Sequence, residues 1–197
     1  METLIPPERY ETAGFVLRSY EVGDGALLAE ATNASYEHLR RFMPWARPHT
    51  TEAEAEVTAR RFRGRWLLSQ DFAMAVVAPD GRRLLGSTGF HPRVDGLTTR
   101  RVEVGMWIRA DEAGRGLGTD VLRAMLQWGF GGWPWEELIW RAAAENVPSQ
   151  RTALRAGMVE VHDGADDMRR FCLPRRAAGC YPSTTSSVPD QDAARRS

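Results

Sequence analysis

Short apolar runs rich in β-branched and aromatic residues recur along this chain, the composition and length typical of buried strands. Pro79-Asp80-Gly81 ends one of them and is a typical turn sequence, while Asp95-Gly96 favours a hairpin turn between two others. The runs that predict strands are 15–18, 72–78, 84–90, 101–108, 137–143, 158–162 and 168–173.

Other segments carry apolar residues at every third or fourth position, the spacing of one helix face. Asp24 and Thr51 are suitable N-cap residues, and Pro44 would stop a short helix. Three predicted helices begin after Asp24, Thr51 and Gly116, and two others cover 36–42 and 148–156. Strands and helices in this order predict an α+β layered domain with a central, mostly antiparallel mixed sheet.

Three glycines at alternate positions, Gly114, Gly116 and Gly118, lie between the strand run 101–108 and a helical pattern. Glycine tolerates positive φ and lets a backbone approach a ligand closely. No Ser, Thr, Asp or Asn stands at the expected N-cap, so the first helix amides lack a side-chain acceptor. Such a helix start suits a phosphate group. The alternative is an ordinary glycine-rich turn before an amphipathic helix.

Two common phosphate-binding loops do not fit this glycine spacing. A P-loop needs a Gly-Lys pair, and the chain has none. The dinucleotide fingerprint G-x-G-x-x-G would need glycine at Thr119 or at Val121. A different class of phosphate ligand is therefore indicated.

Composition and length narrow the classes of function. The chain has 197 residues, and Lys+Arg and Asp+Glu both total 26, so no basic field favours nucleic-acid binding. No apolar run is long enough for a membrane helix, and the N-terminus does not resemble a signal peptide. Cys172 and Cys180 are too few and unsuitably spaced for a disulfide framework or a metal site. We expect a cytoplasmic protein without a metal, a nucleic-acid partner or a membrane.

The same properties predict one folded domain. Residues 1–12 are expected to be a flexible N-terminus, 13–174 the domain, and 175–197, which are polar and without period, a disordered tail.

Three segments together resemble the GNAT superfamily of N-acetyltransferases, and its RimJ/RimL branch in particular. Residues 113–118 are similar to the acyl-CoA loop [QR]-x-x-G-x-[GA], except that Ala113 replaces the leading Gln or Arg. Residues 146–158 resemble the N-x-x-S-x-x-x-x-x-x-x-G-[FM] element, and 38–46 resemble H-L-x-x-[WF]-[ML]-P-W-A. The resemblance implies a sheet splayed between its fourth and fifth predicted strands, with acetyl-CoA in the opening.

The resemblance also implies the residues that would hold acetyl-CoA as co-substrate. Backbone groups of one strand would bind the acetyl and pantetheine groups, amides of the glycine loop would meet the diphosphate, Arg115 would add charge, and Asn146 would reach the pantetheine arm. Arg115 could equally face solvent, and Asn146 could be a helix cap. The expected set is Met106, Trp107, Ile108, Gly114, Arg115, Gly116, Leu117, Gly118, Thr119 and Asn146.

Two residues are candidates for catalysis. Glu103, inside an apolar strand near the expected cleft, would take the proton from the amine; alternatively it faces solvent or pairs with an arginine. Ser149 stands where many GNAT enzymes, though not usually those of the RimJ/RimL branch, carry a tyrosine near the departing thiolate, and it could instead be a simple first-turn serine.

The sequence says less about the acceptor than about the co-substrate. Phe42, Trp45 and His91 are expected to wall its pocket, and aromatic rings within 131–135 could pack the core or serve a homodimer. We expect transfer of an acetyl group to a primary amine, either a protein N-terminus or a small molecule such as an antibiotic. The alternatives are a non-catalytic acyl-CoA-binding or sensing module, or a longer acyl donor such as succinyl-CoA.

Overall fold

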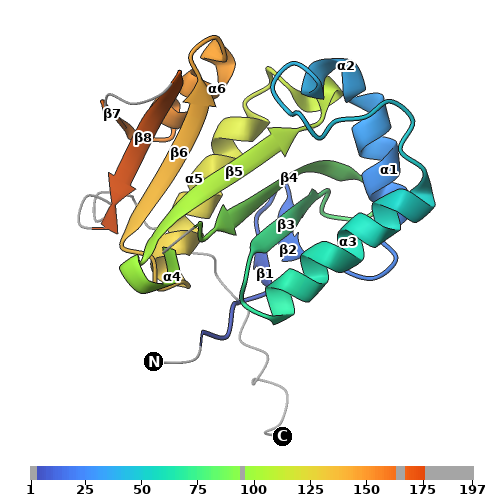
Figure 1. Ribbon diagram of the computed structural model, residues 1–197, viewed down its shortest axis with the longest axis horizontal. Coiled ribbons are helices and arrows are strands. Elements are labelled where there is room, and N and C mark those ends of the chain that lie inside the picture. Colours follow the sequence, from blue (N-terminus) through green and yellow to red (C-terminus); the bar gives the residue numbers. More distant parts are fainter. Residues whose placement is uncertain (1–3, 94–95, 163–166, 176–197) are drawn as a thin grey trace, which may run out of the picture.

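The computed structural model describes residues 4–93, 96–162 and 167–175, which form one eight-stranded sheet (Figure 1). The spatial order is β1-β2-β3-β4-β5-β6-β8-β7, and every neighbouring pair is antiparallel except β5 and β6. The strands are β1 (Arg9–Glu11), β2 (Val16–Ser19), β3 (Phe72–Val77), β4 (Leu84–His91), β5 (Arg101–Ile108), β6 (Glu137–Ala143), β7 (Val159–Val161) and β8 (Met168–Pro174). The predicted fold class, a layered α+β domain with a mixed sheet, is confirmed.

Helices cover both faces of the sheet. They are α1 (Gly25–Ala34), α2 (Tyr36–Leu39), α3 (Glu52–Leu67), α4 (Gly96–Thr99), α5 (Leu117–Gly131) and α6 (Val147–Arg155), with a 3₁₀ turn, η1 (Ala110–Glu112). Helices α1 and α3 pack on one face, where Ala73 and Ala75 of β3 point. Helices α5 and α6 pack on the other face, whose core cluster includes Met74 and Val76. Because strand side chains alternate between faces, the fully apolar β3 serves both cores.

The sheet opens between β5 and β6. These parallel strands pair only at Arg101↔Glu137, Val102↔Leu138 and Glu103↔Ile139, after which each continues without the other. Strand β5 then stays paired with β4 as far as Ile108, and β6 stays paired with β8. The predicted splay between the fourth and fifth predicted strands therefore lies beyond Glu103, and it leaves one backbone edge of β5 facing the opening.

The aromatic rings of residues 131–135 belong to the core. Trp133 and Trp135 are 4% and 0% exposed, and Trp133 packs edge-on against Phe72, Phe90 and Trp66. Burial of these two rings leaves them no role in a homodimer contact. The sequence left this choice open because a Gly/Pro-interrupted aromatic run can serve either purpose.

Several local expectations need correction. Asp24 precedes α1, but its carboxylate accepts hydrogen bonds from Arg18 instead of capping the helix, because β2 brings that buried arginine alongside. The helix predicted over 36–42 ends at Leu39. The hairpin turn expected at Asp95-Gly96 is replaced by α4, with Asp95 outside the described residues.

The chain ends differ in part from expectation. Residues 9–11, placed within the flexible N-terminus, form β1, because the exposed edge of β2 offers backbone partners that local sequence does not reveal. Residues 176–197 of the expected tail lie outside the described residues. Arg175 is described, and its guanidinium donates to the backbone oxygens of Trp133 and Trp135.

Candidate active site

The glycine loop (residues 113–118) connects β5, through η1, to α5. Gly114 and Gly116 have φ of +78° and +94°, which L side chains rarely adopt, although an added Cβ would meet nothing within 4 Å. Gly116 is the N-cap of α5, with no side-chain cap. The loop therefore has the open, uncapped helix start that the sequence predicted, and glycine is required there by backbone conformation and not by space.

Two amides at the start of α5 are available to a ligand. Those of Leu117 and Gly118 have no hydrogen-bond acceptor within the described part of the chain. The Thr119 amide, which we expected to join them, donates instead to the Gly116 carbonyl at 2.9 Å, because the left-handed N-cap turns that carbonyl onto it. Only the hydroxyl of Thr119 is left to contact a diphosphate.

An ion-pair network fixes the segment that leads from β5 into the glycine loop. Arg109, 7% exposed, donates to Glu30 of α1 and to Asp111 of η1. Arg83, from the turn between β3 and β4, binds both Asp111 and Glu112. Hydrogen bonding from Arg109 lowers the pKa of Glu30 below its ordinary range. Arg115 itself is 72% exposed and lies 3.9 Å from Glu112, so it stays available for a phosphate.

The far wall of the opening is built by β6 and α6. Asn146 caps α6 by accepting from the Ser149 amide at 3.2 Å. The indole Nε1 of Trp140, on β6, donates to Ser149 Oγ at 3.0 Å. Capping is thus shown for Asn146, and its amide nitrogen has no hydrogen-bond partner among the described residues, so the cap does not prevent the other expected role.

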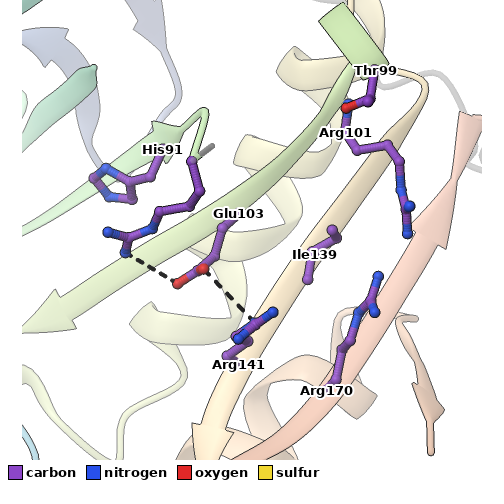
Figure 2. Close-up of a pocket in the computed structure, with 8 residues that line it drawn as sticks. His91, Thr99, Arg101, Glu103, Ile139, Arg141 and Arg170 are labelled. Carbon is purple, nitrogen blue, oxygen red and sulfur yellow. Dashed lines mark hydrogen bonds and ion pairs between the residues drawn. The ribbon is translucent and has the colours of Figure 1, made fainter. Parts of the chain in front are cut away.

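Glu103 lies at the closed end of the opening, in a pocket of about 240 Å³ (Figure 2). Its side chain is 21% exposed, with Arg93 Nη2 at 3.4 Å and Arg141 Nε at 3.9 Å from its two carboxylate oxygens. The arginine pairing that the sequence offered as the alternative for Glu103 is therefore present. It does not remove the carboxylate from the pocket, and both contacts are long for ion pairs.

His91 is the direct antiparallel partner of Glu103. Its Nδ1 lies 2.6 Å from Asp71 Oδ1, and its ring covers Gly105, where an added Cβ would lie 2.7 Å from Nε2. With Nδ1 hydrogen-bonded to Asp71, Nε2 is placed to accept a proton over β5. Figure 2 shows His91 and Glu103 on the same side of β5.

The other expected acceptor residues lie further along β5. Trp45, 49% exposed, stacks at a tilt on Trp107 with ring centroids 6.1 Å apart. Trp107 thus points to the same face as Glu103, while Met106 and Ile108 point to the α5 face, 3.6 Å from a Cβ built on Gly118. Phe42 is half-buried in the same connection as Trp45. The structure does not bring Phe42 or Trp45 among the residues that line the Glu103 pocket.

Sequence reasoning missed Asp71, and it did not identify Arg93 and Arg141 as the arginines that pair with Glu103. Asp71 is a single polar residue before a strand, and its role is visible only from its hydrogen bond with His91, twenty positions away. Arg141 and Arg170 are cross-strand partners on β6 and β8, and the sequence of neither strand indicates that pairing. Cys172 is 6% exposed, and burial raises the pKa of its thiol.

Comparisons with known proteins bear on this arrangement. The profile of the acetyltransferase (GNAT) domain matches residues 15–159. A comparison with curated proteins gave no match. Among the described residues there is no group of His, Cys, Asp or Glu suited to a metal ion, and no helix able to cross a membrane.

Solved structures share the fold at low sequence identity. RimL, the ribosomal L7/L12 α-N-protein acetyltransferase solved with coenzyme A, is 12% identical with a TM-score of 0.73, covering 84% of this chain and 97% of its own. Mycobacterium smegmatis RimJ, solved with a CoA-disulfide, is 20% identical with a TM-score of 0.70, covering 81% of each chain. The microcin C7 self-immunity acetyltransferase MccE, solved with acetyl-CoA and AMP, is 14% identical with a TM-score of 0.71, covering 83% of this chain and 93% of its own. With three-quarters of its length inside the matching profile and the sheet opening in place, this chain belongs to the GNAT acetyltransferase family, enzymes that transfer an acetyl group from acetyl-CoA.

Proposed function

We propose that this protein is an N-acetyltransferase that moves the acetyl group of acetyl-CoA to a primary amine held beside Glu103 and His91. One observation carries the proposal. The opening beyond Glu103↔Ile139 has free helix amides of α5 at one end and a pocket with two proton acceptors at the other. A thioester laid along β5 would meet an amine from that pocket.

In this proposal the glycine loop holds the diphosphate. The amides of Leu117 and Gly118, the Thr119 hydroxyl and the exposed Arg115 guanidinium are the donors, and the positive end of the α5 dipole adds attraction. The pantetheine arm then follows the unpaired edge of β5 at Met106, Trp107 and Ile108, which offers backbone groups as an edge strand does. Asn146 faces it from α6.

The chemistry needs one proton acceptor and a stable geometry. The amine nitrogen attacks the thioester carbon, its proton passes to the protein, and the C–S bond breaks to release the CoA thiolate, which is protonated on leaving. Glu103 is the proposed acceptor of the amine proton, directly or through water, and Arg93 and Arg141 hold its carboxylate in place. Ser149 is the proposed neighbour of the departing sulfur.

The cost of deprotonation favours an α-amine. At pH 7, removing the proton from an α-amine with a pKa near 8 costs about 1.4 kcal/mol, whereas removing it from a lysine amine costs about 4.6 kcal/mol. A protein N-terminus or a small activated amine is therefore the acceptor we propose, as for the ribosomal-protein acetyltransferases with similar folds. We place the reaction in the reducing cytoplasm, which suits the free thiol of Cys172.

The test is acetyl-CoA-dependent release of free thiol with a panel of amine acceptors. Glu103→Gln should lower kcat at neutral pH by about a hundredfold, the range typical of removing a general base, without changing the Kd of CoA. Glu11→Gln, on the far edge of the sheet, is the matched control and should leave kcat unchanged.

Gly116→Glu tests the loop separately. It combines positive-φ strain with a negative charge at the proposed diphosphate site, so the Kd of CoA should rise at least about tenfold in a protein that still folds. An unchanged Kd would disprove the loop assignment. Succinyl-CoA in place of acetyl-CoA tests whether a longer acyl donor is preferred.

A further inference from the structure

The imidazole of His91 lies across two glycines that face each other on β4 and β5. Gly89 and Gly105 are direct cross-strand partners. A Cβ built on Gly89 would lie 3.0 Å from Cε1 of His91, and one built on Gly105 would lie 2.7 Å from Nε2. A side chain larger than glycine at either position would therefore push the ring away, so the paired glycines form a flat seat for it.

Asp71, directly before β3, holds the ring on this seat in one orientation. Its Oδ1 lies 2.6 Å from Nδ1 of His91, and the two side chains are only 20% and 22% exposed. A carboxylate accepts hydrogen bonds and cannot donate them, so the hydrogen between the two groups belongs to Nδ1. In a neutral imidazole the other nitrogen, Nε2, is then an acceptor and not a donor.

This acceptor is placed inside the opening. Nε2 lies above Gly105 and has no hydrogen-bond partner within the part of the chain that the structure describes. Glu103 is the last residue of β5 paired with β6, and Gly105 is the next residue on the same face. His91 and Glu103 line one pocket, and in Figure 2 the ring and the carboxylate lie apart on the same side of β5. The pocket thus presents two separate acceptors at neighbouring positions.

An attacking primary amine has two hydrogens for these two acceptors. In the proposed reaction one of them passes to Glu103 as the C–N bond forms. The other stays on the nitrogen and becomes the N–H of the product amide, so it needs an acceptor that does not remove it. With both hydrogens engaged, the lone pair of the nitrogen is left to face the thioester carbon.

We propose that Nε2 of His91 accepts a hydrogen bond from the hydrogen that the amine keeps, and that this bond makes the enzyme select primary over secondary amines. Asp71 is the positioning residue, because it fixes the tautomer. The proposal rests on the proposed function and adds a specificity residue to it. A secondary amine has one N–H, so it leaves one of the two acceptors unpaired, and a site built to bind an N–H group discriminates against an analogue that lacks it.

Matched acceptors that differ in the number of N–H bonds test the proposal. One pair is the peptide amide Ala-Ala-Phe and the same peptide with N-methylalanine as its first residue. The other is ethylamine and its isomer dimethylamine. With the parent protein, kcat/KM for thiol release should be at least about tenfold higher for the primary member of whichever pair reacts.

Two variants separate hydrogen bonding from steric exclusion of the methyl group. Asp71→Leu removes the acceptor of the Nδ1 hydrogen and leaves the space around the amine unchanged, so Nε2 is free to take the hydrogen and become a donor. His91→Asn can still donate to Asp71 but has no acceptor at the position of Nε2. Both variants should lower the preference for the primary amine severalfold, whereas a steric preference would survive in Asp71→Leu.

His162→Gln is the control, because His162 is exposed and follows β7 at the edge of the sheet. It should keep the preference of the parent protein. Thermal melts check that each variant folds. Nitrogen NMR of labelled histidine, with His91→Asn to identify the signals of His91, reads the tautomer without any acceptor. At pH 7 the ring should carry its hydrogen on Nδ1 in the parent and on Nε2 in Asp71→Leu.

The outcomes separate this proposal from the proposed function. If primary and secondary amines react equally well, or if Asp71→Leu keeps the preference, acetyl transfer to an amine stands and the role of His91 is overturned. If no amine releases thiol, the proposed function fails, and the NMR spectrum decides about His91. A hydrogen on Nε2 in the parent then overturns the proposal, while a hydrogen on Nδ1 that moves in Asp71→Leu supports it.

Discussion

The indole Nε1 of Trp140 donates a hydrogen bond to the hydroxyl oxygen of Ser149 at 3.0 Å, joining β6 to the first turn of α6 at the wall of the opening. Trp140 is only 4% exposed, so its indole has this partner in place of water. Because Ser149 Oγ accepts from Trp140, its own proton is left for another acceptor. The pair therefore ties the wall together and directs a hydroxyl group.

Ser149→Ala should lower stability by about 1–3 kcal/mol, because it leaves a buried indole N–H unsatisfied. Trp140→Phe removes the donor instead, and in the double variant the loss should be less than the sum of the two single losses. Urea denaturation of the four proteins gives the coupling energy. Additive losses would show that the hydrogen bond contributes nothing.

The same variant tests the proposed role of Ser149 toward the sulfur. A thiol with pKa near 8.5 needs little acid assistance, so Ser149→Ala should reduce kcat only about tenfold or less at pH 7. The reduction should shrink as the pH is raised above the pKa of the thiol, because the thiolate is then stable without a proton. Single-turnover thiol release across pH measures it, and a reduction independent of pH would argue against this role.

His91 and Asp71 form a second candidate for accepting the amine proton. If His91 Nε2 takes the proton, Asp71→Asn should lower kcat about a hundredfold or more, because the hydrogen bond that fixes the imidazole tautomer is changed. If Glu103 takes it, Asp71→Asn should affect KM more than kcat. Steady-state kinetics of Asp71→Asn and Glu103→Gln side by side decide between the two.

The ion pair between Glu30 and Arg109 should make stability depend on acid pH. The pKa of Glu30 is lower in the folded protein than its ordinary value of 4.5, so its contribution is fully present above that value and is lost as the pH falls through the lowered pKa. Glu30 is 55% exposed, so the contribution is reduced by solvent screening. The melting temperature of Glu30→Gln should be below that of the parent at pH 7 and approach it near pH 3; a constant difference would contradict this.

The pair formed by Arg18 and Asp24 should matter more for stability than any pair in the pocket. Their side chains are 11% and 9% exposed, and two hydrogen bonds of 2.7 Å join them. Asp24→Asn removes the charge that compensates a buried guanidinium, a change that costs about 3–5 kcal/mol. Glu37→Gln, in the exposed pair with Arg40, is the control and should cost less than about 1 kcal/mol. Chemical denaturation compares them.

Local sequence was sufficient where the determining interactions are local. Thr51 forms the capping box with Glu54 that its spacing suggests, and the uncapped start of α5 follows from the absence of capping residues near Gly116. Strands β5 and β6 begin and end at their predicted residues because their apolar runs are long and bounded. The loop residues of the candidate site were therefore accessible from sequence.

Contacts between distant segments were not accessible in this way. No local signal shows that Asp24 accepts hydrogen bonds from Arg18, that β1 pairs with β2, or that Asp71 is hydrogen-bonded to His91. The pocket around Glu103 is a further example, because the arginines that line it come together only where β4, β5, β6 and β8 lie side by side.

The sequence by itself determined most of the order of elements, the glycine loop and the family, because propensity, periodicity and short motifs act within a few residues. The tertiary structure alone decided where the sheet opens, which face Glu103 shares with His91, and how many charges meet there. The physical reason is that register and strand order arise from packing between segments far apart in the chain, and electrostatic interactions depend on distance in space, not on position in the sequence.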